Sequence, residues 1–187
     1  ARVEPSEQKL TELKSEFAES ALASVARNVD AARERLGFAD EAITTGRALA
    51  AKPVAGEVGE LVDCVRGAES SLQQANTMLD AVDSAASDIR RAVSTLPSAI
   101  EDIQRGITQA GAQLAEGGLG KEVELSAARD EAVKAVTAAQ ATGAADPLGT
   151  FTTLTQADAD LDRLLAGVAE EREAAERLMR SYSKALF

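Results

Sequence analysis

Apolar residues recur every three or four positions between Val54 and Leu114. This spacing keeps one face of an α-helix turned toward a neighbour over many turns, and it is typical of coiled-coil packing. It predicts long helices whose packing face offers no nucleophile, no ligand cluster and no pocket lining. The apolar seam consists of Val54, Val58, Leu61, Val65, Ala68, Leu72, Ala75, Leu79, Val82, Ala86, Ile89, Val93, Leu96, Ile100, Ile103, Ile107, Ala110 and Leu114.

Proline and capping residues predict where four helices begin and end. The first ends before Pro53, because the residue preceding a proline is pushed out of the helical backbone region. Ser98, with Glu101 three residues later, forms a capping box that starts the third. Asp146 as N-cap and Pro147 in the first turn start the fourth. The predicted helices cover 6–52, 54–94, 98–142 and 147–187.

Two features leave the course of the middle helices open. The seam keeps its phase across Pro97, so the second and third helices form either a hairpin at this proline or one long kinked helix. We favour the hairpin. The glycine-rich stretch 117–120 shifts the seam, which predicts a turn or an interruption of the third helix there.

Nearly equal helices joined by short connections are what an antiparallel up-down bundle requires. We therefore expect an all-α fold, an elongated antiparallel helical bundle or an array of coiled-coil-like helical hairpins, forming a single elongated domain over 1–187. The periodic pattern runs to Phe187 without a capping glycine, which predicts that the chain is a fragment of a longer one.

Composition and charge narrow the choice of partners. Only 3% of the residues are aromatic and there is no tryptophan, which predicts a thin core of Leu, Val, Ile and Ala between closely packed helices. The net charge of −11 argues against nucleic acid and anionic membranes as direct partners. The longest uncharged stretches, 135–145 and 147–157, are far shorter than the about 20 residues of a membrane helix.

The residues that usually carry chemistry are missing or in the wrong pattern. Histidine, the commonest general base and zinc ligand, is absent. The acidic run 158–162 has the opening spacing of a calcium loop, but Arg163 replaces the required glycine and Ala169 the required glutamate. The lone Cys64 is expected to be a half-buried structural thiol. We predict no catalytic, cofactor-binding or metal-binding residues, and no enzymatic activity.

The charged residues near the end of the chain form an exposed helical face. Glu173 with Arg177, and Glu176 with Arg180, have the i,i+4 spacing that stabilises an exposed helix. Glu171 falls on the seam and is expected to lean into water at the end of the helix. The seam itself continues through Ala175, Leu178 and Tyr182.

Several stretches resemble the long helical region of actinobacterial TPM-domain proteins. They are Asp146-Pro147-Leu148-Gly149-Thr150-Phe151, Leu154-Thr155-Gln156-Ala157-Asp158, Leu161-Asp162-Arg163-Leu164-Leu165, Glu170-Glu171-Arg172-Glu173-Ala174-Ala175-Glu176-Arg177-Leu178, Ala68-Glu69, Gln74-Ala75 and Met78-Leu79-Asp80-Ala81-Val82-Asp83. The resemblance implies a parent protein with an extracytoplasmic TPM domain, a membrane segment, this helical region on the cytoplasmic face and a glycine-rich tail. Any phosphatase-like activity of that family has no matching residue in these stretches.

The expected function is that of a non-catalytic spacer or scaffold in a larger membrane-anchored protein. Its helical faces would bind a protein partner or a second copy, with no cofactor, no nucleic acid and no small-molecule ligand. The alternative is an amphipathic bundle that opens to bind lipid or a partner helix.

Overall fold

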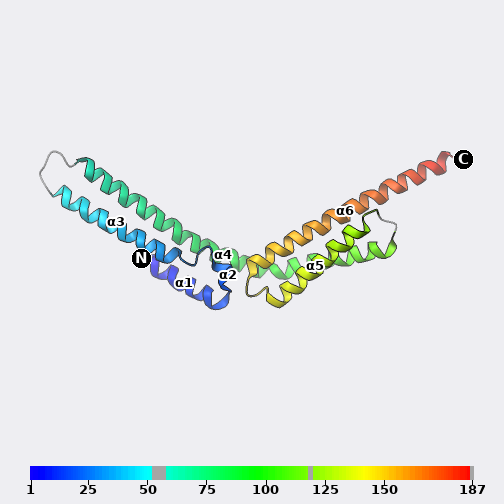
Figure 1. Cartoon of the computed structure of the whole chain (residues 1–187), viewed down its shortest axis with the longest axis horizontal. Helices are drawn as coiled ribbons and strands as arrows, with labels where there is room; N and C mark the ends of the chain where they lie inside the picture. Colours follow the sequence, from blue (N-terminus) through cyan, green and yellow to red (C-terminus); the bar gives the residue numbers. More distant parts are fainter. Residues whose placement is uncertain (52–57, 118–119, 186–187) are drawn as a thin grey trace. The chain divides into compact units, whose positions relative to one another are not determined.

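The computed structural model describes residues 1–51, 58–117 and 120–185, and all regular structure in these ranges is helical, which confirms the all-α fold (Figure 1). The predicted break at Pro53, the first seam residue Val54 and the chain end at Phe187 lie outside these ranges. The helices are α1 (Val3–Glu16), α2 (Glu19–Leu22), α3 (Asn28–Ala50), α4 (Val58–Glu116), α5 (Glu122–Thr142) and α6 (Pro147–Ala185).

Contacts divide the chain into two compact units, Ala1–Arg90 and Arg91–Phe187. Unit 1 contains α1, α2, α3 and the first half of α4, and unit 2 contains the second half of α4 with α5 and α6. Helix α4 therefore supplies a packing face to both units.

The hairpin favoured at Pro97 is wrong, because α4 runs through this proline as one helix of 59 residues. Proline removes one backbone hydrogen bond and crowds the preceding turn, at a cost of about 3 kcal/mol. Pro97 lies on the exposed side of α4, where water can reach the carbonyl that loses its partner. Ala92 and Leu96 are buried on one side of it and Ile103 on the other, so packing outweighs the local penalty.

The capping box predicted at Ser98 is also wrong, because Ser98 lies within α4. Its hydroxyl donates to the carbonyl of Thr95 at 2.9 Å. The hydroxyl of Thr95 donates in turn to the carbonyl of Arg91 at 2.9 Å. Hydroxyls that bond back to helix carbonyls in this way are tolerated inside a helix, so a serine followed by Glu101 does not need to be a helix start.

The single helix predicted over 6–52 is wrong as well. Helix α1 ends at Glu16, Phe17 and Ala18 are extended, and α2 and a turn over 23–27 lead into α3. Neither glycine nor proline marks this break. Its cause is tertiary: the chain folds back so that α1 packs on α3, forms ion pairs with α4, and buries Leu10 and Leu13. A continuous helix would carry these leucines away from that surface.

Unit 1 has an apolar interior between α1, α3 and the first half of α4. Polar contacts hold α1 in place at its edges, since Arg2 pairs with Asp80 at 2.6 Å and Lys9 pairs with Asp83. Buried side chains of this unit include Val3, Leu10, Leu13, Leu22, Val25, Val29, Ala32, Ala39, Ala68, Ala75, Leu79, Val82, Ala86 and Ile89.

Unit 2 is a three-helix bundle of α4, α5 and α6. Helix α4 ends at Glu116 and Gly117 has φ 67°, a left-handed conformation that glycine adopts without strain, so the interruption predicted at 117–120 is confirmed at its described positions. Gly118 and Leu119 lie outside the described residues. The buried cluster consists of Leu96, Ile103, Ala110, Leu125, Ala132, Ala135, Val136, Ala139, Leu154, Leu161, Leu165 and Val168.

The start of α6 follows the prediction. The backbone N–H of Gly149 donates to the Asp146 carboxylate at 3.0 Å, and Pro147 is the first helical residue. A carboxylate at this position accepts a hydrogen bond from an N–H that has no partner within the helix. A proline in the first turn costs no backbone hydrogen bond, because an N–H at that position would have no partner within the helix either. The sequence signal and the structure agree because the interaction is local.

Candidate interaction surfaces

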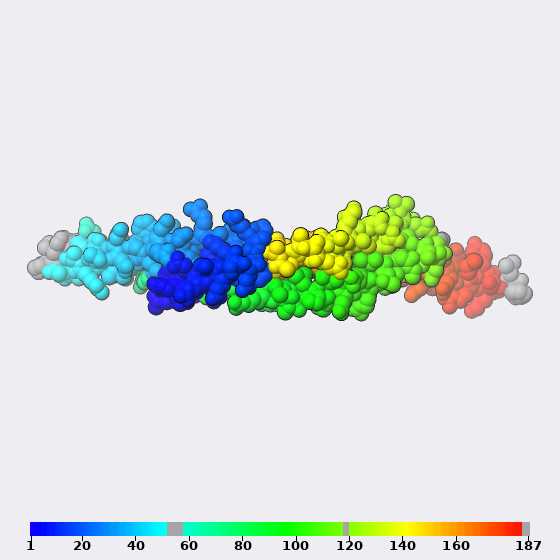
Figure 2. Space-filling view, turned by 90° about the horizontal axis from the view of Figure 1, so that it is seen from below, coloured from blue at the N-terminus to red at the C-terminus, as the bar shows by residue number. Residues whose placement is uncertain are grey.

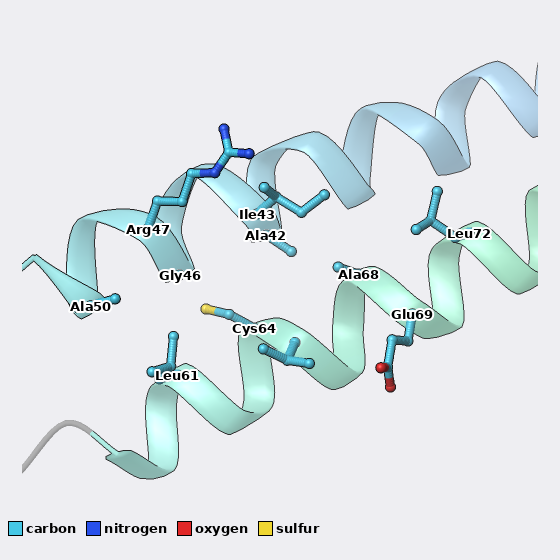
Figure 3. Close-up of a pocket in the computed structure, with 11 residues that line it drawn as sticks. Ala42, Ile43, Gly46, Arg47, Ala50, Leu61, Cys64, Ala68, Glu69 and Leu72 are labelled. Atoms are coloured by element: carbon cyan, nitrogen blue, oxygen red, sulfur yellow. The ribbon is translucent and has the colours of Figure 1, made fainter. Parts of the chain in front are cut away.

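An apolar groove lies between α3 and α4 within unit 1, where the two helices approach closely at Gly46 and Cys64 (Figure 3). A Cβ added to Gly46 would lie 3.3 Å from the Cβ of Cys64, so the close approach depends on the missing side chain. The thiol points toward α3 and is half-buried, as the sequence predicted. The groove has a volume of about 320 Å³ and is lined by Ala42, Ile43, Gly46, Arg47, Ala50, Leu61, Cys64, Val65, Ala68, Glu69 and Leu72.

The groove is open because α1 does not extend over this part of α3 and α4. Arg2, at the start of α1, reaches Asn76 and Asp80 of α4. Between the start of α4 and Asn76, the α3–α4 pair continues past α1 without contacting it, as Figures 1 and 2 both show. Two seam residues on this stretch, Val65 and Leu72, are accordingly 49% and 40% exposed. The seam predicted that both would be covered, and within the described chain they are not.

The second candidate surface is the end of α6 in unit 2. Every side chain from Glu173 to Lys184 is exposed, and the helix runs on beyond α5 and the end of α4 (Figures 1 and 2). Leu178, Met179 and Tyr182 are 58%, 71% and 63% exposed. Helical spacing places these three side chains on one side of α6. The seam continues here as predicted by spacing, but nothing in the described chain covers it.

Ion pairs mark the point where α6 leaves the bundle. Arg172 pairs with Glu116 at the end of α4 and also donates to the carbonyl of Gln113 at 3.4 Å. Glu171 pairs with Lys121, just before α5, at 3.2 Å. Glu171 therefore has a cationic partner, whereas the sequence suggested that it leans into water. These contacts secure α6 at the bundle edge and leave the following residues to project.

The exposed end is stabilised within its own helix. Arg177 pairs with Glu173 at 3.2 Å and Arg180 pairs with Glu176 at 3.4 Å, which confirms both i,i+4 pairs predicted from the sequence. Exposed pairs of this kind contribute a few tenths of a kcal/mol each. They support the helix without burying its apolar side.

Acidic side chains of α4 and α6 lie close together inside unit 2. Burial raises the pKa of the Asp158 carboxyl, the nearby Asp162 and Asp102 carboxylates raise it further, and Arg105 lowers it. The calcium-loop spacing at 158–162 lies inside α6, as expected, where Asp160 pairs with Arg163 at 2.9 Å. Asp158 is half-buried, so the prediction of a wholly solvated acidic face does not hold for this residue.

Two further observations on the described ranges concern metal ligands and membrane-spanning helices. Within these ranges, no three Cys, Asp or Glu side chains gather closely enough to hold a metal ion. None of the described helices combines the length and the apolar composition needed to cross a membrane.

Comparison with known proteins finds relatives that are much longer than this chain. The chain is 51% identical over 189 residues to the UPF0603 protein MT2410 of Mycobacterium tuberculosis (strain CDC 1551 / Oshkosh) and, equally, to the UPF0603 protein Rv2345 of Mycobacterium tuberculosis (strain ATCC 25618 / H37Rv). The match covers 100% of this chain but spans only 28% of the length of these curated relatives. No protein-family model matches the chain, and no solved structure matches it significantly.

Proposed function

We propose that this chain is a non-catalytic helical region of a larger membrane-anchored protein, of the actinobacterial TPM-domain type. In this proposal it acts as a spacer or scaffold on the cytoplasmic face of the membrane and binds a protein partner or a second copy through its helical faces. The observation that carries the proposal is the presence of two apolar surfaces on well-formed helices, the α3–α4 groove and the end of α6.

The interior of the described chain supports a structural role. Its buried side chains are apolar apart from Ser6, so the packing face holds helices together and presents no arrangement of polar groups. Exposed apolar side chains that lie together on regular helices are typical of protein-binding surfaces. The match to one region of a longer relative is what a spacer or scaffold inside a larger protein would show.

The experiment compares variants of the full-length protein in its own membrane. Polar substitution of the groove (Val65→Gln with Leu72→Gln) is expected to remove a cross-linked complex that the unchanged protein forms, because it removes exposed apolar contacts without disturbing the core. Val123→Gln is the matched control, since Val123 is 80% exposed on α5 and lies outside both surfaces. A complex of unchanged mass in the groove variant and in a corresponding α6 variant contradicts the proposal.

A second candidate function is lipid binding by the end of α6. One observation favours it: Leu178, Met179 and Tyr182 share a helix with Arg177, Arg180 and Lys184, as in helices that lie on a membrane surface. Flotation with anionic liposomes separates the two candidates. If the region binds protein, the chain should stay in the soluble fraction, because anionic liposomes repel its net charge of −11. Flotation that is lost in Leu178→Gln would favour lipid binding.

A further inference from the structure

In each of the two units, one apolar helical surface has no described neighbour. In unit 2, α6 packs into the space between α4 and α5 and buries Leu154, Leu161 and Leu165 there. Among the described residues, no third helix covers the α3–α4 groove of unit 1, and no helix pair lies against residues 173–184 of α6 in unit 2. We propose that residues 173–184 of α6 in one copy bind the α3–α4 groove of a second copy.

The apolar residues of the two surfaces suit each other. Leu178 and Tyr182 are four positions apart and Met179 lies beside them, which gives α6 one bulky apolar side. The groove presents Val65 and Leu72, which are exposed. Its floor is made of small residues, Ala42, Gly46, Ala50 and Ala68, and small residues let a third helix approach closely.

The described exposed part of α6 is long enough to cover the groove. The groove follows α4 from Leu61 to Leu72, which is twelve residues. The side chains of α6 are exposed from Glu173 to Lys184, so at least twelve residues of this helix are available. At 1.5 Å per residue both stretches are about 17 Å long, so the helix end can cover the groove along its whole length.

Charge favours α6 of a second copy over a second groove. The groove lining itself carries one basic and one acidic side chain, Arg47 and Glu69. The described residues of the α3–α4 pair between 40 and 72 are acidic as a whole, since Asp40, Glu41, Glu60, Asp63 and Glu69 outnumber Arg47 and Arg66. Residues 173–184 contain three basic residues, Arg177, Arg180 and Lys184, and two acidic ones, Glu173 and Glu176, so this segment carries a small positive net charge. Two grooves facing each other would bring like charges together, whereas the α6 end brings opposite charge to the acidic hairpin. The pairing of the two arginines with Glu173 and Glu176 reduces this attraction without reversing it.

This inference rests on the proposed function and names the partner as a second copy of the chain. A cross-linking experiment tests it, because Cys64 is the chain's one cysteine and it lies in the groove. The unchanged chain is mixed with a Cys64→Ala, Met179→Cys variant and treated with a short bis-maleimide. We expect a cross-linked pair that joins Cys64 of one copy to position 179 of the other.

The matched control moves the new cysteine to the opposite side of the same helix. Helical geometry places Arg180 roughly opposite the apolar side of α6, so Cys64→Ala with Arg180→Cys is expected to cross-link at least about tenfold less. Equal yields at positions 179 and 180 overturn the proposal, since they indicate random collision. A chain that carries both Cys64 and Met179→Cys and cross-links only within itself also overturns it.

Sedimentation equilibrium of the unmodified chain provides an independent readout. We expect concentration-dependent self-association that is lost in Leu178→Gln with Met179→Gln. Helix content and melting temperature, compared at a concentration where both chains are monomeric, should stay unchanged because both residues are exposed. Val123→Gln is the control and is expected to associate as the unchanged chain does. A chain that stays monomeric up to about 1 mM, the weak end of specific binding, overturns the proposal.

The outcomes separate this inference from the function it builds on. If the purified chain is monomeric but the full-length protein still loses its complex on groove substitution, the second copy is wrong and the interaction region stands. If α6 instead binds liposomes through Leu178 and Met179, the partner of α6 is a membrane surface and not a second copy of the chain. If neither surface affects any complex, both proposals fail.

Discussion

Gly106 on α4 faces Leu161 on α6 at close range, since a Cβ added to the glycine would lie 3.1 Å from Cδ2 of the leucine. Both residues are buried in unit 2, and Leu161 belongs to its apolar cluster. Because Gly106 has no side chain, α4 and α6 can approach each other closely, and the side chain of Leu161 fits between them.

Gly106→Val is expected to destabilise unit 2 by about 1–3 kcal/mol, because the added methyl groups overpack against Leu161. The measurement is chemical denaturation followed by circular dichroism. Gly111→Ala is the control on the same helix: a Cβ there meets nothing within 4 Å, so the gain in helix propensity should stabilise it by about 0.5–1 kcal/mol. Equal effects of the two substitutions would show that the contact with Leu161 is unimportant.

Pro97→Ala is expected to stabilise α4, by up to about 3 kcal/mol, because it restores a backbone hydrogen bond and relieves crowding in the preceding turn. The residue is exposed, so the substitution leaves no cavity. Helix content and the midpoint of denaturation are the measurements. A hairpin at this position would respond in the opposite way, since alanine lacks the turn preference of proline.

Asp83 is expected to make unit 1 sensitive to acid. The hydrogen bond and charge of Lys9, together with Arg2, hold the pKa of the Asp83 carboxyl below its ordinary value. A group with a lowered folded-state pKa contributes stability above its unfolded pKa and loses it as pH falls through the folded value. Because the side chain is 42% exposed, solvent screening limits this contribution to about 1 kcal/mol or less.

Denaturation of Asp83→Asn and of the unchanged chain, from about pH 7 down to below the ordinary aspartate pKa of about 3.9, tests this expectation. The variant should be less stable than the unchanged chain at neutral pH, and the difference should shrink toward the acid end. A difference that is constant across the range would mean that the charge of Asp83 contributes nothing.

Asp158 is expected to behave in the opposite sense. Its raised pKa means that the ionised carboxyl costs stability above that pKa, and that the cost disappears when the group is protonated. Asp158→Asn should therefore stabilise unit 2 at neutral pH, by about 0.5 kcal/mol because the group keeps contact with water. Asp160→Asn is the control: it loses the pair with Arg163 and should give no gain.

Local sequence signals predicted this fold where the interactions themselves are local. The Asp146 cap, the turn at Gly117 and the Glu173–Arg177 pair all depend on residues within a few positions of one another, and all three are present. Seam spacing likewise predicted the interior of unit 2, because residues such as Ile103 keep one face along α4.

The predictions that failed depend on long-range packing. No glycine or proline in the sequence marks the break after Glu16. It forms because α1 packs against α3 and forms ion pairs with Asp80 and Asp83 of α4, which lie far away in sequence. Pro97 carries a strong local signal, but buried residues on both sides outweigh it. The sequence pattern also failed to predict that Val65 and Tyr182 are exposed, because spacing shows which residues share a helix face but not whether a neighbouring helix covers that face.

Truncation of the α4 seam should therefore have unequal effects, although spacing alone predicts the same role for each residue. Leu79 and Ile103 are 2% and 0% exposed, so Leu79→Ala and Ile103→Ala should each cost about 2–5 kcal/mol through lost burial and the cavity left behind. Leu72 is 40% exposed beside the groove, and Leu72→Ala should cost about 1 kcal/mol or less because little new cavity forms. Denaturation of the three variants at a concentration where the chain is monomeric checks this order. If Leu72→Ala costs as much as Ile103→Ala there, a helix of the same chain must cover the groove, and the surface we assign to binding would belong to the core.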